Sequence, residues 1–227
     1  MKKSILFVED NAIAQSLISE VFGTENQIEI TGDYATAMEK LSQGQYDLVI
    51  TDIFFPQETG TGKKEMAGEL AERLKNFVKE KGIENFFETL EEALFNKEFI
   101  EDEKKLTYKL KYVKNEIRHI TYCVEKAERI AGAVDSWLSS QDEADQPLGI
   151  LVAEECEKRG LKFRMASSLF HHNDKLEAIN QFVSSKKWSD IFDYGHKNSS
   201  GEELENPKEH RIFWEEMRKE VTKGSAA

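Results

Sequence analysis

Three carboxylates stand directly at the ends of two short apolar runs. Residues 48–51 lead to Asp52, and residues 4–8 lead to Glu9 and Asp10. Short apolar runs bounded by polar residues are typical of buried parallel strands, and open α/β sheets bind their ligands at the carboxyl ends of such strands. If the two strands are neighbours, the carboxylates converge and repel one another unless a cation compensates them. Oxygen ligands with room for water suit Mg²⁺, so the sequence predicts a Mg²⁺-assisted site in which Asp52 receives a phosphoryl group.

Each of these features also has a plainer interpretation when it is taken alone. Asp52 could end a strand and cap a turn, and Glu9 and Asp10 could form a solvated acidic turn before a helix. The chemical interpretation therefore depends on the three residues acting jointly.

Length and composition limit the functions that this chain can have. The chain has 227 residues, enough for one large or two small domains, and a formal net charge of −12, which argues against nucleic acid as a partner. Cys123 and Cys156 lie far apart without metal-ligand spacing and are expected to be structural thiols. Because no stretch approaches the ~20 apolar residues of a membrane span and no signal peptide is evident, we expect a soluble, cytoplasmic protein.

The two ends of the chain alternate between strand and helix patterns, which predicts an α/β fold with a parallel sheet. Asn11 and Asp33 are expected to cap two helices, with Ile13, Leu17, Ile18 and Val21 as the apolar positions of the first. The predicted strands are residues 4–8, 27–31, 48–52, 162–167 and 190–194. The predicted helices of the second half are residues 147–159, which contain Gly149 near the start, residues 174–186, and a last helix that begins at Asn206 and Pro207.

The middle of the chain, residues 57–146, breaks this alternation. We expect two helices at residues 63–81 and 83–97, followed by an apolar heptad seam from Leu106 to Leu138. The seam is expected to pack within this helical arm or to pair with a second copy of the chain in a coiled coil. We therefore expect a discontinuous α/β domain, residues 1–56 and 147–222, a helical insertion at 57–146, and a disordered tail at 223–227.

The acidic pair, Asp52 and Pro56 four residues after it closely resemble the receiver domain of response regulators in two-component signalling. The resemblance covers residues 1–56 and 147–222 and implies a flavodoxin-like (βα)5 fold with strand order 2-1-3-4-5. It implies that Glu9, Asp10, Asp52 and the backbone carbonyl of Phe54 bind Mg²⁺, and that Asp52 is the phosphoacceptor.

Three further receiver positions follow from the same resemblance. Ser167 matches the hydroxyl residue after the fourth strand, and Tyr194 matches the switch aromatic. Lys197 lies at the family's spacing after Tyr194 and would bind a phosphoryl oxygen, although Asn198 replaces the Pro that usually follows it. Lys208, near the start of the last helix, is the alternative for this role.

The leading functional interpretation is a phosphorylation switch rather than an enzyme. A histidine kinase or phosphotransfer protein would supply the phosphoryl group to Asp52, and output would pass by protein contact through residues 57–146. The alternative is a pseudo-receiver, a scaffold that is not phosphorylated in normal use. A phosphohydrolase of the haloacid-dehalogenase type would need a second Asp where Phe54 stands. His171 and His172 have no third ligand that would complete a metal site and are expected to form a polar rim near Asp52, whereas His119 is expected to be a surface residue.

Overall fold

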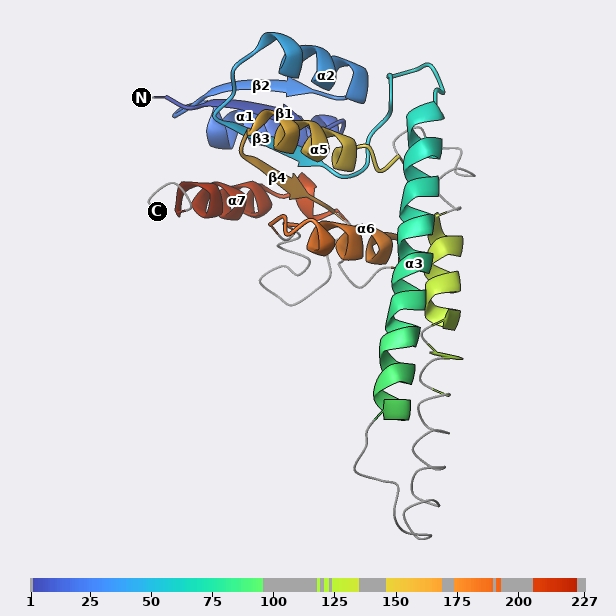
Figure 1. Cartoon of the computed structure of the whole chain (residues 1–227). Coiled ribbons are helices and arrows are strands. Elements are labelled where there is room, and N and C mark those ends of the chain that lie inside the picture. Colours follow the sequence, from blue (N-terminus) through green and yellow to red (C-terminus); the bar gives the residue numbers. More distant parts are fainter. Residues whose placement is uncertain are drawn as a thin grey trace, which may run out of the picture.

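The chain folds around a parallel β-sheet with helices on both faces (Figure 1). The computed structural model describes residues 2–95, 118, 121–122, 124–134, 146–168, 174–189, 191–192 and 206–223. The strands are β1 (Ser4–Val8), β2 (Gln27–Thr31), β3 (Leu48–Asp52) and β4 (Phe163–Ala166), and they lie in the order β2-β1-β3-β4. All three strand pairs are parallel, which confirms the predicted α/β class.

The predicted fifth strand is described only at Ile191 and Phe192. Phe192 forms a single parallel bridge to Ala166 of β4. The backbone N–H of Phe192 donates to the carbonyl of Met165 (2.9 Å), and the N–H of Ser167 donates to the carbonyl of Phe192 (2.9 Å). This short segment therefore follows the edge of β4, while Asp190 and residues 193–205 lie outside the described residues.

Helices cover both faces of the sheet. One face carries α1 (Ala12–Phe22) and α7 (Arg211–Lys223), which bury Ile18, Phe213 and Trp214 against the sheet. The other face carries α2 (Tyr34–Gln43) and α5 (Gly149–Arg159). Each face thus has its own apolar core, since successive strand residues such as Leu6 and Phe7 point to opposite sides.

Local sequence signals explain most of the helix boundaries. The side chain of Asn11 accepts hydrogen bonds from the N–H groups of Ile13 and Ala14, and Asp33 caps α2 in the same manner. Gly160 ends α5 in the left-handed conformation (φ 68°), which glycine adopts without strain. The prediction of an inward-facing Ile13 is wrong, because Ile13 is 53% exposed and Ala14 takes the buried position.

The start and the end of the last helix also differ from the prediction. Pro207 to Glu209 form a separate 3₁₀ turn, η2 (Pro207–Glu209), and α7 begins only at Arg211. Ile212 is 44% exposed, so Phe213, Trp214 and Met217 make the apolar face. Helix α7 includes Lys223, one residue of the predicted disordered tail, and residues 224–227 lie outside the described part of the chain.

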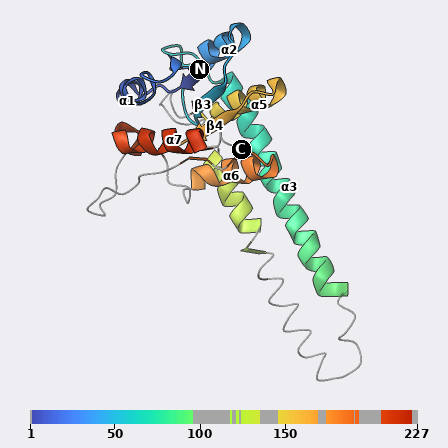
Figure 2. The same cartoon turned by 90° about the vertical axis from the view of Figure 1, so that its left-hand side faces the viewer.

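A long helix extends away from the sheet, α3 (Glu65–Phe95), as Figures 1 and 2 both show. Its 31 residues form one continuous helix, so the prediction of two helices that break near Gly82 is wrong. A glycine inside a helix costs only about 1 kcal/mol relative to alanine, and the residues on both sides of Gly82 favour helix. A single weak position therefore does not end α3.

The base of α3 packs against α6 (Asp174–Ser185) and against the helical residues 124–134. Leu70, Leu74 and Val78 of α3 share one buried cluster with Ile130 and Val134. Within the described part of the heptad seam, Ala127, Ala131 and Val134 pack inside the chain, whereas Val124 is 40% exposed. The rest of the predicted seam lies outside the described residues. No helix in the described ranges is both long enough and apolar enough to cross a membrane.

Candidate functional site

The carboxylates of Glu9, Asp10 and Asp52 meet at the carboxyl edge of the sheet. Glu9 and Asp10 follow β1, Asp52 ends β3, and β1 and β3 are parallel neighbours, so their ends lie side by side. One oxygen of each carboxylate lies within 4.8 Å of the others. Glu9 and Asp52 are buried, whereas Asp10 is half-buried and gives the cluster access to solvent. The three residues that the sequence predicted as a group are thus brought together.

A lysine ammonium lies between two of these carboxylates. Lys208 Nζ donates to Oε1 and Oε2 of Glu9 (3.1 and 2.9 Å) and also to Oδ2 of Asp52. Lys208 is only 3% exposed, so this is a buried ion-pair network rather than a surface salt bridge. The other oxygen of Asp52, Oδ1, accepts the N–H of Ile53 at 2.7 Å. Both oxygens of the predicted phosphoacceptor therefore have partners.

Burial and charge shift the pKa values of Glu9 and Lys208. Burial raises the pKa of Glu9 to about 7, because loss of solvent outweighs the opposing attraction of Lys208, and the charge of Asp52 raises it further. Burial alone would lower the pKa of Lys208, but the charges of Asp52 and Glu9 outweigh it and hold this pKa above its usual value. Lys208 is therefore charged at neutral pH, whereas Glu9 titrates close to neutrality.

Glu9 is expected to make the metal-free protein less stable as the pH rises. Because its pKa is about 7 in the folded protein and about 4.5 in the unfolded chain, the folded protein binds an extra proton between these values. The free energy of unfolding should thus fall through this window, by at most about 3 kcal/mol, relative to the Glu9→Gln variant. Urea unfolding of both proteins with a chelator, from pH 4.5 to pH 7.5, measures the difference. Parallel pH curves for the two proteins would contradict the raised pKa.

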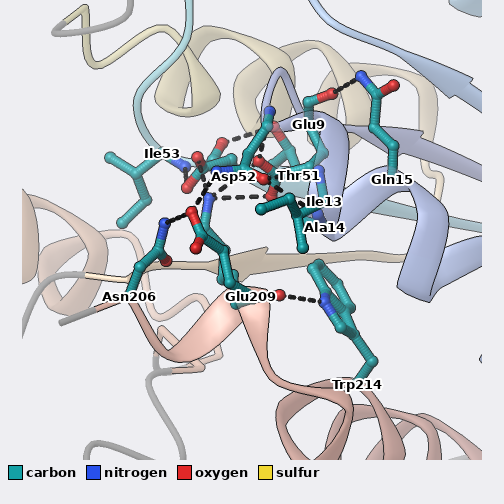
Figure 3. A network of polar contacts seen from close by, with 12 residues as sticks. Glu9, Ile13, Ala14, Gln15, Thr51, Asp52, Ile53, Asn206, Glu209 and Trp214 are labelled. Atoms are coloured by element: carbon teal, nitrogen blue, oxygen red, sulfur yellow. Dashed lines mark hydrogen bonds and ion pairs between the residues drawn. The ribbon is translucent and has the colours of Figure 1, made fainter. Parts of the chain in front are cut away.

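The turn that carries Lys208 is fixed by a polar network, which Figure 3 shows. The indole Nε1 of Trp214 donates to the carbonyl of Lys208 at 2.8 Å. Oε1 of Glu209 accepts from the side-chain amides of Asn11 and Asn206, both at 2.9 Å. Since Asn11 also caps α1, the network ties η2 to the helix that follows Glu9 and Asp10. Lys208 is positioned by these tertiary contacts.

The backbone of Asp52 lies directly against the first residue of α5. The N–H of Gly149 donates to the carbonyl of Ile53 at 3.0 Å. A Cβ on Gly149 would lie 2.1 Å from the carbonyl oxygen of Asp52 and 2.8 Å from Cα of Ile53. Only glycine therefore allows α5 to approach the end of β3 this closely.

The loop between Asp52 and α3 is fixed on both sides. The N–H of Phe55 donates to the carbonyl of Gln146 (3.1 Å), and Nε2 of Gln146 donates to the carbonyl of Lys63 (3.0 Å). The N–H of Tyr34, at the start of α2, donates to the carbonyl of Pro56 at 3.1 Å. Phe55 is fully buried. The segment that leads from Asp52 to α3 is thus packed into the domain.

The remaining predicted site residues fall into two groups. Ser167 follows β4 beside the end of β3 and is buried, and Phe54 follows Ile53 and packs partly buried against the core. Their roles as a hydroxyl contact and a carbonyl ligand stay predictions. Tyr194 and Lys197 lie outside the described residues, as do His119, His171 and His172. Lys208, which the sequence offers as an alternative, lies among the carboxylates in the described part of the chain.

The donor set at this edge fits a divalent cation. Glu9, Asp10 and Asp52 supply carboxylate oxygens, the ligands that Mg²⁺ and Ca²⁺ prefer. The ammonium of Lys208 already compensates part of the charge of Glu9 and Asp52, so a cation that binds both of them must displace it or bind on the Asp10 side. The cluster could therefore bind a metal ion.

The chain was compared with known proteins by family, by sequence and by structure. No family model, curated protein or solved structure matches it.

Proposed function

We propose that this chain is a phosphorylation-switched receiver of the response-regulator type, in which Asp52 accepts a phosphoryl group with the help of Mg²⁺. The observation that carries the proposal is the convergence of Glu9, Asp10, Asp52 and Lys208 at the carboxyl edge of a parallel sheet. Three carboxylates and one lysine form a set that can hold a cation and bind phosphoryl oxygens.

In this proposal the fold is flavodoxin-like, and Ile191 and Phe192 belong to a fifth strand next to β4. The order 2-1-3-4 and the bridge from Phe192 to Ala166 support it. Residues 57–146, which include α3, form an inserted helical arm between β3 and α5.

The chemistry proposed for Asp52 is a single displacement at phosphorus. A carboxylate oxygen of Asp52 forms a bond to phosphorus while the bond from phosphorus to the histidine nitrogen of the donor breaks, and its electron pair stays on that nitrogen. Bound Mg²⁺, held by Glu9, Asp10 and Asp52, would supply charge stabilisation of the phosphoryl oxygens. Lys208 can donate a hydrogen bond to the transferred phosphoryl group, because its ammonium already contacts Oδ2 of Asp52.

The donor in this proposal is a histidine kinase or a phosphotransfer protein, and output passes by protein contact through the arm. The base of α3 shares a buried cluster with Ile53, the residue directly after Asp52. A change at Asp52 therefore acts next to a residue of the buried cluster that also contains Leu70 and Leu74 of the arm.

A second candidate is a pseudo-receiver scaffold, which one observation favours. Lys208 already pairs with both Glu9 and Asp52, and Asp52 is only 6% exposed. In this alternative Lys208 serves as the internal counter-charge, and the site needs neither metal nor phosphate to be stable. Its function would then be to present the arm to a binding partner.

Intact mass distinguishes the two candidates. The protein is incubated with acetyl phosphate and Mg²⁺, beside Asp52→Asn and beside a chelator control. We expect wild type to gain one phosphoryl group and both controls to gain none. If wild type gains none, the switch is excluded and the scaffold remains; a gain in Asp52→Asn would place the acceptor elsewhere.

A further inference from the structure

A cavity lies at the amino-terminal edge of the sheet, opposite the carboxylate cluster. It has a volume of about 960 Å³ and opens beside the first residues of β3 and β4, the turn after α6 and the end of α7. This volume is at the upper end of the range for small-molecule sites, about 300–1,000 Å³. The cavity contains none of the residues of the carboxylate cluster.

Basic side chains dominate the charge of this cavity, although the chain as a whole has a net charge of −12. Lys3, Lys162, Arg164 and Lys187 all line it. Lys162 and Lys187 are exposed, so their ammonium groups can reorient towards a ligand at little cost.

The two acidic residues in the described lining of the cavity already have partners. Oδ2 of Asp47 accepts the N–H of Ser4 at 2.8 Å, and Glu220 forms an ion pair with Arg164. With Arg164 paired with Glu220, the exposed lysines Lys162 and Lys187 outnumber Asp47, so the described part of the lining keeps an excess of positive charge. The cavity is therefore suited to an anion.

An aromatic and apolar wall lies beside these lysines. Trp188, Phe163 and Leu161 line the cavity. The Trp188 ring packs edge-to-face on Phe163 at 5.3 Å, and its Nε1 donates to Glu157 at 2.9 Å. Lys186 Nζ also lies over this ring, 5.9 Å from its centroid. The half-buried indole is thus held in one orientation, and a flat ligand would pack on its exposed part.

We propose that this cavity binds a small phosphorylated molecule with a planar ring, of the nucleoside phosphate class. The phosphate lies at Lys162 and Lys187, and the ring packs against Trp188. Several lysines suit a phosphate, which carries up to two charges, better than a single carboxylate, and the indole adds the stacking surface that a ring requires. The proposal does not depend on the function proposed for Asp52, because the two sites lie at opposite edges of the sheet.

Calorimetric titration of the full chain with AMP tests this site. Separate titrations with adenosine and with inorganic phosphate measure the binding of the two halves of AMP. All titrations contain a chelator and low salt. We expect AMP to bind at least about tenfold more tightly than either half, because the ring and the phosphate contact different parts of the cavity. The double variant Lys162→Glu, Lys187→Glu should weaken AMP binding by at least about tenfold.

The matched control is Lys79→Glu, the same charge reversal at an exposed lysine of α3 that does not line this cavity. It should leave AMP binding unchanged. Thermal unfolding of each variant shows that it is folded, and Lys162→Gln with Lys187→Gln replaces the double variant if charge reversal disturbs the fold. The proposal would be overturned if AMP did not bind, or if AMP affinity fell equally in the Lys162→Glu, Lys187→Glu double variant and in Lys79→Glu.

Discussion

Replacement of Lys208 by methionine is expected to lower the free energy of unfolding by about 3–5 kcal/mol in metal-free buffer, the usual loss when one partner of a buried ion pair is removed. Methionine keeps most of the volume of the side chain but removes the ammonium that contacts Glu9 and Asp52. Both carboxylates are buried, so water cannot replace the lost charge. Chemical denaturation of wild type and Lys208→Met with a chelator measures the difference.

Two additions to this experiment separate charge from packing. Saturating Mg²⁺ should restore much of the free energy of unfolding that Lys208→Met loses. The space that the ammonium leaves between Glu9 and Asp52 can then hold a divalent cation. Lys219→Met, at a lysine whose side chain is 58% exposed, should change stability by less than about 0.5 kcal/mol. A loss below about 1 kcal/mol in Lys208→Met would mean that the ion pair contributes little.

Substitution of Gly149 by alanine is expected to destabilise the protein by at least about 3 kcal/mol, the upper range for overpacking. The added Cβ would lie 2.1 Å from the carbonyl oxygen of Asp52, and backbone atoms cannot rotate away as a side chain can. Helix α5 or the end of β3 must therefore move. Because Asp52 is the proposed phosphoacceptor, phosphoryl uptake should fall together with stability.

Gly68 is the matched control for this substitution. It lies in the first turns of α3, and a Cβ there would meet nothing within 4 Å. Gly68→Ala should stabilise the protein by about 0.5–1 kcal/mol, since alanine is the better helix former. Thermal or urea unfolding of both variants tests the pair. If Gly149→Ala were as stable as wild type, the close approach of α5 to β3 would be contradicted.

The sheet and the carboxylate cluster could be predicted because their signals are local. The strands β1 and β2 coincide with the predicted residues 4–8 and 27–31, since each is a short apolar or alternating run between polar turns. Once two such strands are parallel neighbours, the residues that follow them must meet at one edge. The grouping of Glu9, Asp10 and Asp52 needs no further information.

The contact of Lys208 with Glu9 and Asp52 could not be predicted by the same reasoning. Lys208 is far from the carboxylates in sequence and reaches them because Trp214 and Glu209 hold η2 against α1, which no spacing rule contains. The one local signal is its place directly after Pro207, at the start of a helical turn. The continuity of α3 is not evident from the sequence for a different reason: the apolar positions of residues 63–81 and 83–97 fall on two different faces, which favours two helices, whereas Glu65–Phe95 form one.

The attachment of α3 has a mechanical consequence. Its first turns are packed against the domain in the buried cluster that contains Ile53, and the helix runs for 31 residues, a length of about 46 Å at ~1.5 Å per residue. As a rigid lever, such a helix converts a tilt of about 5° at Glu65 into a displacement of about 4 Å at Phe95. Small rearrangements near Asp52 would thus be amplified into movements large enough to make or break contacts with a partner at the far end.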